Sequence, residues 1–455
     1  MTSPTPRKRL IVIGAGFAGV NLVKQLRDVP IEIDLLDKHN YHCFQPLLYQ
    51  VATAALSAGD IAHPIRRIFR NQANVSVAMG EIERMDLARR QVCSGDVCLH
   101  YDYLTIAVGV THSYFGNEKW QLLAPGLKSV DDATRIRGHV LLAFEEAELE
   151  DDEASRRAKL TFVVVGGGPT GVEMAGALRE IAANDIPRDF RNIDTKTSRI
   201  ILLQGGDRLM PQLHPALSAR AKRDLEAIGV EVRLNSRVTS VDESGVYLGD
   251  QHLPAGNVIW AAGVQAPRLL DTLGVPQDRS GRIIVNQQLN VPGHPEVFVV
   301  GDAASAKDAK TGQPIPGLAP AAIQMGRFVG RIIGDEIVRG TSVAERPAFH
   351  YRDKGTLATI GRRRAVADIR GWRFSGVFAW LLWSIVHISF LISFRSKLFV
   401  MAGWIYDYLF RTREARLITG KFALKVSKAR GTGGGPPEPT VELVPTGGVQ
   451  ERKVS

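Results

Sequence analysis

The hydrophobic pattern at the start of the chain is that of a parallel sheet buried on both faces. An apolar run over residues 10–13 leads through Gly14-Ala-Gly-Phe-Ala-Gly19 into a helical stretch that continues to about residue 27. A second apolar run, residues 31–36, ends on Asp37. Continuous apolar runs of this length are typical of strands covered by helices. The order strand, glycine-rich turn, helix, strand and acid predicts a Rossmann-type dinucleotide-binding unit.

The same pattern returns about 150 residues later. An apolar run at 160–165 precedes Gly166-Gly-Gly-Pro-Thr-Gly171, a helix is expected through residue 181, and a strand is expected over 199–203. Two copies of one supersecondary pattern indicate two copies of one fold. The predicted fold class is therefore α/β, with two Rossmann-type domains.

Three further apolar runs end on glycine, at 103–109, 257–263 and 297–301, and Asp302 follows the last of them. The first two are expected to close one sheet each and to mark a crossover between domains. The third is expected to return to the first sheet, which makes the first domain discontinuous, with the second inserted into it.

The C-terminal pattern predicts attachment to a membrane surface. Residues 376–394 carry no formal charge, but about nineteen residues are barely enough to cross about 30 Å of hydrocarbon. The run also contains serines and a histidine, and residues 398–410 are amphipathic with tryptophan and tyrosine. Monotopic attachment therefore fits better than a span. The predicted organisation is a first dinucleotide domain at 1–112 and 271–345, a second at 113–270, a C-terminal amphipathic membrane-anchoring region at 346–428 and a disordered tail at 429–455.

Composition and charge narrow the class only slightly. A chain of 455 residues with 45% hydrophobic residues can bury sizeable cores. The net charge of +10 suits nucleic acid, anionic membrane or acidic cofactors, so its sign decides nothing. Between Arg395 and Arg430 there are nine basic residues against two acidic ones, directly after the most apolar stretch. This block favours a membrane surface.

The cysteines and the N-terminus favour the cytoplasm or its membrane face. Cys43, Cys93 and Cys98 form no C-x-x-C pair and are too few for a disulfide framework, so a reducing compartment is expected. The first nine residues are polar and basic and lead directly into a strand, without a secretory apolar segment. A metal site is not expected.

Each glycine in the first fingerprint has a physical role. One makes the tight turn, one lets the backbone approach a pyrophosphate, and one lets helix and strand pack closely. A lone fingerprint could be a glycine-rich turn without a ligand, but the flanking elements and Asp37 favour a dinucleotide. After the second fingerprint, Gln204 replaces the acid. Glutamine can bind a ribose hydroxyl but does not repel a 2′-phosphate, so NADH is expected over NADPH with less discrimination.

These residues together resemble one family, the type II NADH:quinone oxidoreductases, over about residues 8–425. The family consists of single-subunit, membrane-surface flavoenzymes within the glutathione-reductase-like superfamily. The two fingerprints and Gly301-Asp302 are shared with that superfamily. More specific are the segments 40–52 (Asn-Tyr-His-Cys-Phe-Gln-Pro-Leu-Leu-Tyr-Gln-Val-Ala), 258–264 and 319–324, with the aromatic, basic C-terminal region.

The resemblance implies the cofactors and the reaction. The first fingerprint holds FAD and the second NADH; hydride passes from NADH to the flavin, which reduces a membrane quinone, ubiquinone or menaquinone, without proton pumping. It also implies a homodimer bound peripherally to the cytoplasmic side of the cell inner membrane. The residues expected to contact the cofactors are Gly14, Gly16, Phe17, Ala18, Gly19, Asp37, Lys38, Pro46, Gly109, Gly166, Gly168, Pro169, Thr170, Gly171, Gln204, Gly263, Gly301, Asp302 and Ala322.

Two residues are expected to be catalytic. By the resemblance, Glu173 lies near nicotinamide and flavin, where a raised pKa would let its carboxyl pass protons to the quinone. The alternative is a first-turn acid that complements the helix dipole. Gln324 is expected to hydrogen-bond a quinone carbonyl, or else to be a helix-surface glutamine. The family often has glutamine where this chain has Pro320. For His42, a satisfied loop histidine is favoured over a base.

Other functions are weighed against this one. Dithiol reductases need a redox cysteine pair, and sulfide:quinone oxidoreductases need cysteines late in the chain, so both are disfavoured. The alternative is a soluble NADH oxidase or a ferredoxin or rubredoxin reductase whose apolar C-terminus joins subunits. A binding protein for nucleic acid is supported only by the aromatic and basic residues at 404–416. No nucleic-acid partner is expected.

Overall fold

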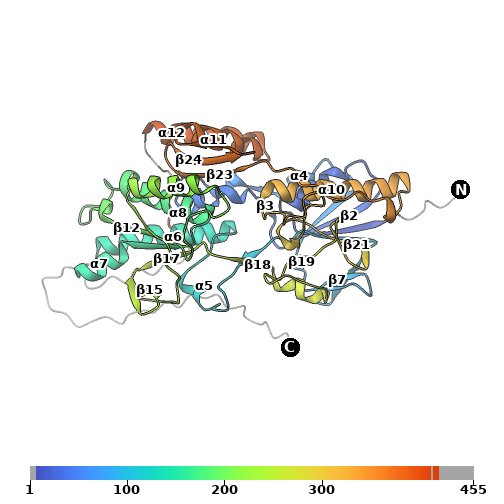
Figure 1. Cartoon of the computed structure of the whole chain (residues 1–455), viewed down its shortest axis with the longest axis horizontal. Helices are drawn as coiled ribbons and strands as arrows, with labels where there is room; N and C mark the ends of the chain where they lie inside the picture. The colour runs from blue at the N-terminus through green and yellow to red at the C-terminus, as the bar shows by residue number, and fades with distance from the viewer. Residues whose placement is uncertain (1–6, 411–412, 414, 420–455) are drawn as a thin grey trace, which may run out of the picture.

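The computed structural model describes residues 7–410, 413 and 415–419. The chain forms two α/β lobes, and a smaller C-terminal layer lies over the second lobe (Figure 1). The predicted tail at 429–455 lies outside the described residues.

The first lobe is built on a six-stranded sheet in the order β20-β21-β9-β1-β2-β5. Its central strands are parallel, and Ile13 of β1 is in register with Leu36 of β2 and Ile106 of β9. Two of its strands come from the chain beyond residue 289, so the sheet is assembled from separate segments. The bounds are β1 Arg9–Ile13, β2 Glu32–Asp37, β5 Val75–Met79, β9 Tyr103–Ile106, β20 Asn290–Val291 and β21 His294–Val299.

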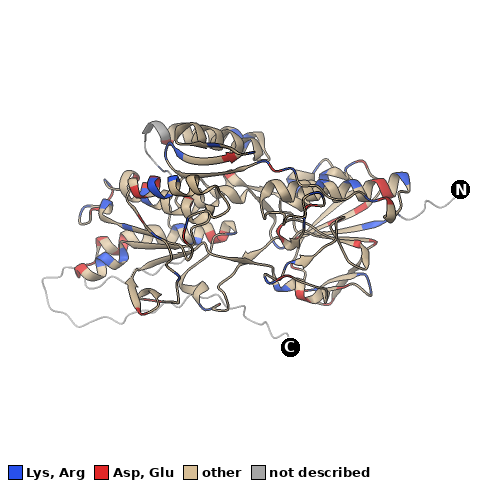
Figure 2. Cartoon of the chain, viewed as in Figure 1, with Lys and Arg blue, Asp and Glu red and all other residues tan. Residues whose placement is uncertain are grey.

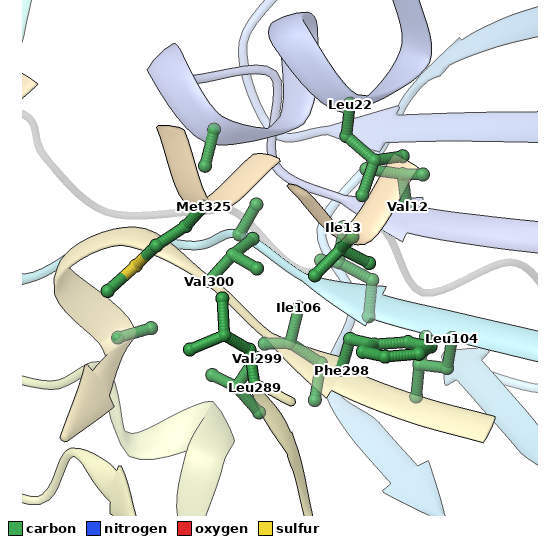
Figure 3. Packing of buried hydrophobic residues seen from close by; sticks show 14 of the residues in the cluster. Val12, Ile13, Leu22, Leu104, Ile106, Leu289, Phe298, Val299, Val300 and Met325 are labelled. Carbon is green, nitrogen blue, oxygen red and sulfur yellow. The ribbon is translucent and has the colours of Figure 1, made fainter. Parts of the chain in front are cut away.

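Helices α1 (Phe17–Gln25) and α10 (Ala319–Arg339) pack against each other beside this sheet. The central strands of the sheet are buried beneath them, and Val12, Leu104 and Phe298 are fully buried (Figure 3). The two helices approach so closely that a Cβ on Gly326 would lie 2.2 Å from the carbonyl oxygen of Ala18. The shared core therefore joins the first fingerprint to α10.

The second lobe has a four-stranded parallel sheet in the order β13-β12-β11-β17. Val165 of β11 is in register with Leu203 of β12, which repeats the arrangement of the first fingerprint. Its strands are β11 Thr161–Val165, β12 Arg199–Leu203, β13 Val230–Arg233 and β17 Asn257–Trp260, and its larger helices are α6 Val130–Glu148, α7 Glu153–Lys159, α8 Pro169–Glu180 and α9 Pro215–Ala227. Helix α8 passes into a π-helix, Ile181–Asp185.

Short elements complete the lobes. The two crossing segments pair as antiparallel strands β10 (Thr111–His112) and β18 (Val264–Gln265). The remaining elements are β3 Tyr41–Cys43, β4 Ala62–Pro64, β6 Arg84–Asp86, β7 Gln91–Ser94, β8 Val97–His100, β14 Ser240–Asp242, β15 Gly245–Leu248, β16 Gln251–Pro254, β19 Ile283–Ile284, β22 Ala304–Ser305, α2 Leu48–Ala52, α3 Ala58–Ile61, α4 Ile65–Phe69 and α5 Trp120–Leu123.

The C-terminal layer contains a sheet that the hydrophobic pattern did not predict. Three antiparallel strands, β23 (Thr356–Gly361), β24 (Arg364–Ile369) and β25 (Trp372–Ser375), precede helices α11 (Val377–Phe390) and α12 (Phe394–Phe410). Strand β23 lies against α8, where a Cβ on Gly176 would be 1.8 Å from the carbonyl oxygen of Ile360. Among the described residues, no helix is long and apolar enough to cross a membrane.

Two cysteines form a disulfide, although the sequence favoured a reducing compartment. Cys93 and Cys98 form a disulfide, because they lie directly opposite each other in the antiparallel pair β7 and β8. Cys43 is free. The disulfide lies in the small sheet β6-β7-β8 of the first lobe and belongs to neither glycine fingerprint.

We predict that Gly176→Ala destabilises the protein, because the new methyl group meets backbone that cannot move independently. Overpacking of this kind lowers the free energy of unfolding by about 1–3 kcal/mol. The matched control is Gly403→Ala on α12, where a Cβ would meet no described atom within 4 Å. Thermal denaturation compares the two variants, and a melting temperature of Gly176→Ala equal to that of the unsubstituted protein contradicts the contact.

Candidate active site

The first glycine turn leaves one glycine free to face a ligand. Gly14 has φ +101°, and a Cβ there would lie 2.4 Å from the carbonyl oxygen of Ala107. A Cβ on Gly19 would lie 1.9 Å from the carbonyl oxygen of Gly14. Gly16, by contrast, is exposed and caps the N-terminus of α1. Gly14 and Gly19 thus allow the packing, and Gly16 leaves the backbone open to an anion at the helix N-terminus.

The second turn repeats this division. Gly166 has φ +112° and a Cβ site 2.7 Å from the backbone of Ala261, and a Cβ on Gly171 would lie 1.8 Å from the carbonyl oxygen of Gly166. Gly168 caps α8, and its Cβ site has no described atom within 4 Å. Both lobes therefore present the same cradle for a pyrophosphate.

The side chain after the second strand supports each turn. The Asp37 carboxylate accepts hydrogen bonds from the amide of Ala15 (2.7 Å) and from that of His39 (2.8 Å). In the second lobe, Gln204 Oε1 accepts from the Gly167 amide at 2.9 Å, and its Nε2 donates to the Arg208 carbonyl at 3.2 Å. Gln204 therefore supports its turn as Asp37 does, but without a negative charge.

Gly301 and Asp302 lie where α1 and α10 meet. Gly301 has φ +69° and begins a 3-10 turn, Gly301–Ala303. A Cβ on Gly301 would be 3.5 Å from the Cβ atoms of both Ala18 and Ala322. The structure thus brings together three of the predicted contacts, which lie far apart in the sequence.

Lys128 is a charged neighbour of this turn that the sequence did not identify. It directly precedes Ser129, which caps α6. Burial raises the pKa of Asp302, whereas the positive charges of Lys128 and Arg282 lower it. Burial lowers the pKa of Lys128, and the Asp302 carboxylate opposes that effect. A lysine in a loop between domains carries no local signal of this role.

The other predicted contacts surround the two turns. Gly109 and Gly263 follow strands β9 and β17 with φ +67° and +72°. The Cβ site of Gly263 lies 2.6 Å from the ring of Phe115, which is 62% exposed. The remaining positions are Phe17 in the first turn of α1, exposed Lys38 after β2, Pro46 in the 3-10 turn Gln45–Leu47, and Pro169 and Thr170 in the first turn of α8.

The His42 ring is hydrogen-bonded to the backbone of the first glycine turn. Its Nδ1 lies 2.8 Å from the carbonyl oxygen of Ala15, to which the neutral ring donates. Burial lowers the pKa of His42 to about 4, so the ring is neutral at neutral pH. The edge contacts of Phe17 with His42 (5.2 Å) and Phe44 (5.8 Å) extend the same cluster. His42 is thus a hydrogen-bonded histidine that supports the turn before α1. The sequence favours this role over that of a catalytic base.

Glu173 is the buried acid of the second lobe. It lies on α8, and the Thr359 amide of β23 donates to Oε1 at 3.4 Å. Burial raises the pKa of Glu173 to about 8, against the smaller opposing effects of Thr359 and the Trp383 indole. A first-turn acid complementing the helix dipole would instead be ionised. With its pKa raised to about 8, the carboxyl retains a proton at neutral pH, and its part in proton transfer stays a prediction.

An aromatic wall from the C-terminal layer encloses this carboxyl. Trp383, 2% exposed, stacks on His387 with ring centres 4.2 Å apart and contacts Trp404 at 5.3 Å. The buried Trp383 indole N–H is near enough to Glu173 to lower its pKa, but it completes no hydrogen bond of ordinary geometry in the described part of the chain. His387 Nδ1 lies 2.7 Å from the Trp383 carbonyl oxygen, and burial lowers the His387 pKa to about 4. Phe44 meets the edge of His387 at 6.1 Å.

A hydrogen-bonded chain links this wall to α2. Trp404 Nε1 donates to Gln50 Oε1 at 2.8 Å, and Gln50 Nε2 donates to the Tyr49 hydroxyl at 2.9 Å. Burial and the Glu173 charge raise the pKa of Tyr49. Tyr49 and Gln50 belong to the family-specific segment 40–52, but the sequence alone indicated no role for either residue.

Gln324 is engaged by the backbone. Its Nε2 donates to the carbonyls of Pro320 (3.1 Å) and Arg352 (3.0 Å), and its Oε1 accepts from the Arg352 amide at 3.0 Å. These bonds occupy both N–H groups of the amide. The side chain joins α10 to the segment before β23, and its predicted contact with a quinone stays a prediction.

Two dinucleotide cradles in a discontinuous α/β chain define a two-dinucleotide flavoprotein. The family model described as pyridine nucleotide-disulphide oxidoreductase matches residues 8–326, and that described as the NDH2 C-terminal domain matches 354–413. The type II NADH:quinone oxidoreductase Ndh of Mycobacterium tuberculosis is 41% identical over 434 residues, covering 92% of each chain. The chain belongs to the type II NADH:quinone oxidoreductase family, which confirms the resemblance.

More distant relatives have the same family name or the same fold. The type II NADH:quinone oxidoreductase of Staphylococcus haemolyticus is 28% identical, covering 81% of this chain and 92% of its own. The structure of NDH2 from Plasmodium falciparum in complex with NADH has a TM-score of 0.82 at 21% identity, covering 91% of this chain and all of that one. The latter shows the fold alone.

The raised pKa of Glu173 makes stability depend on pH. Between the ordinary value of 4.5 and about 8, the folded state retains a proton that the unfolded state has lost. Stability contributed by Glu173 therefore falls as pH rises through this interval and is constant outside it. Glu173→Gln cannot ionise at this position. Over the same interval its free energy of unfolding therefore rises relative to that of the unsubstituted protein, by at most about 1.4 kcal/mol per pH unit.

Thermal melting between about pH 5 and about pH 9 checks this prediction, with Glu118→Gln as an exposed control. Parallel pH profiles for Glu173→Gln and the unsubstituted protein would show that the carboxyl is ionised throughout.

Proposed function

We propose that this chain is a single-subunit respiratory enzyme that oxidises NADH and reduces a membrane quinone without pumping protons. FAD occupies the first cradle and NADH the second. The observation that carries the proposal is the buried, protonated Glu173, which α8 of the nucleotide lobe and the NDH2-type C-terminal layer enclose together. When bound, FAD accepts hydride from NADH and passes two electrons to the quinone.

The cradles fit these cofactors. Gly16 and Gly168 leave each helix N-terminus open to a pyrophosphate, as a side chain there would not. We assign Asp37, at the end of β2, and Gln204, directly after β12, to the ribose hydroxyls of the two cofactors. Asp302, with the opposing charge of Lys128, is available to the FAD of the first lobe.

Proton balance assigns a role to Glu173. Reduction of a quinone to a quinol consumes two electrons and two protons, and hydride supplies both electrons but only one proton. The second proton must come from the protein or from water. Glu173 holds a proton at its carboxyl at neutral pH, and we assign that proton to the quinone oxygen. The closed aromatic wall of Trp383 and His387 excludes bulk water from the carboxyl.

The C-terminal layer also provides the membrane-facing surface. Helices α11 and α12 carry few charges (Figure 2). Many of their apolar side chains, together with Trp372 of β25, are 40–80% exposed, and exposed apolar surface of this kind marks an interaction site. The exposed residues are Trp372, Val377, Phe378, Leu381, Ile385, Phe390, Phe394, Leu398, Phe399, Met401 and Ile405. We assign this surface to peripheral, monotopic attachment; a homodimer and the cytoplasmic side stay predictions.

The basic block does not face the membrane as a whole, which corrects the sequence interpretation. Arg395 is exposed and lies over the Phe399 ring at 5.2 Å, beside the apolar surface. Arg413 and Arg416 instead turn inward to carboxylates of the second lobe. The basic residues beyond 419 lie outside the described chain.

We expect purified protein to lose its yellow flavin colour with NADH and to regain it with a soluble quinone. In Glu173→Gln, recolouring should slow by about 100-fold, the lower range for a positioned general acid, while bleaching by NADH is retained. Stopped-flow spectroscopy measures both steps, with NADPH replacing NADH to test Gln204. Recolouring only by oxygen or a protein acceptor would favour the soluble oxidase or ferredoxin reductase instead.

The membrane surface has its own test. We expect the triple variant Phe378→Ser, Ile385→Ser and Phe399→Ser to bind lipid vesicles at least about tenfold more weakly, since each buried apolar side chain contributes roughly 1.5–3 kcal/mol. The control Val338→Ser and Val343→Ser removes exposed apolar groups at the end of α10 and beyond it. Co-sedimentation with vesicles is the measurement; equal binding by both variants would remove α11 and α12 as the attachment surface.

A further inference from the structure

The chain beyond α12 returns to the second lobe and buries a positive charge there. Arg413 is 7% exposed, although its side chain ends in a charged guanidinium. Burying such a group is unfavourable unless charges and hydrogen-bond acceptors surround it. The location of its partners therefore shows what the contact holds together.

Four partners from three elements surround the guanidinium. Its nitrogens lie 3.1 Å from Glu180 Oε2 and 2.7 Å from Asp185 Oδ2. It also donates to the carbonyl of Thr53 at 2.7 Å and to that of Ala177 at 3.4 Å. Thr53 ends α2, Ala177 and Glu180 lie on α8, and Asp185 ends the π-helix. One side chain thus joins the end of α2 to α8 and to the π-helix.

The same carboxylate receives a second contact from the C-terminal layer. Glu180 Oε1 accepts a hydrogen bond from the amide of Arg362, in the turn between β23 and β24. The Arg362 guanidinium donates to the carbonyl of Asp407, near the end of α12. Glu180 therefore contacts the C-terminal layer at the β23–β24 turn and also binds Arg413, which follows α12.

The elements that Arg413 joins carry the wall of the active site. Helix α8 carries Glu173, seven residues or about 10 Å before Glu180. Helix α2 carries Tyr49 and Gln50, and Gln50 holds Trp404 of α12. Arg413 therefore contacts both elements that carry the groups around the Glu173 carboxyl.

We propose that Arg413 is a positioning residue for quinone reduction, which holds the C-terminal layer closed over Glu173 by bridging α2, α8 and the π-helix. The inference rests on the proposed function. Arg413 contacts neither glycine turn, because its partners lie at the far end of α8 and at the end of α2. Its loss should therefore alter the quinone step and leave reaction with NADH intact.

The test uses full-length, FAD-loaded protein and a soluble short-chain quinone. In Arg413→Met, which keeps the aliphatic stem, the quinone concentration that half-saturates flavin reoxidation should rise about tenfold or more, as expected when a site is displaced. The rate of flavin reduction by NADH should stay within about twofold. The matched control is Arg157→Met, because Arg157 pairs with Glu153 in an exposed ion pair on α7, away from the bridge.

Arg413→Lys supports the test if the methionine variant does not fold, since lysine keeps the charge but not the fork of donors. It should shift quinone saturation in the same direction by a smaller factor. Hydrogen exchange should also speed up in α11 and α12 while the two glycine turns keep their protection.

The outcomes separate this inference from the proposed function. An unsubstituted protein that does not reduce quinone overturns the proposed function, whatever Arg413 does. If the unsubstituted protein reduces quinone and Arg413→Met saturates normally, only the positioning role is overturned. Equal loss of both half-reactions also overturns it, because that pattern indicates general destabilisation.

Discussion

The close contact between helix α8 and strand β23 is the constraint on which the active site depends. It exists because Gly176 has no side chain, which lets the carbonyl oxygen of Ile360 approach the helix backbone. At this distance the Thr359 amide reaches Glu173, and the sheet excludes water from the carboxyl. The raised pKa of Glu173 is thus a consequence of backbone packing rather than of a neighbouring charge.

Apolar and charged residues of the C-terminal region serve different purposes. The apolar faces of α11 and α12 are directed outward, whereas Arg413 enters a pocket that two carboxylates share. Burial raises the pKa of Asp185 to about 6, and the nearby arginines oppose that effect. A buried ion pair of this kind adds little net stability but specifies one arrangement of its elements. It therefore suits a layer that must lie in one position over the site.

The two nucleotide lobes show how far local rules reach. The spacing of the fingerprint glycines and the acid or amide after the next strand were readable from the sequence, because each sets the backbone geometry of one turn. Asp37 and Gln204 indeed accept a turn amide in the same way. The α/β class and the two dinucleotide sites followed from these short motifs, whereas the family followed from the segments 40–52, 258–264 and 319–324 and the C-terminal region. The roles of individual residues in the reaction remain predictions.

The sequence by itself determined the elements whose conformation depends on neighbours within a few residues: the main strands of the two nucleotide lobes, the fingerprint turns and the apolar helices, but not the C-terminal sheet. Only the tertiary structure decided which distant groups meet. It engaged the Gln324 amide with Arg352, enclosed Glu173 with Trp383 and His387, and turned Arg413 inward. These contacts join positions far apart in the chain, and hydrophobic periodicity carries no information about such pairings.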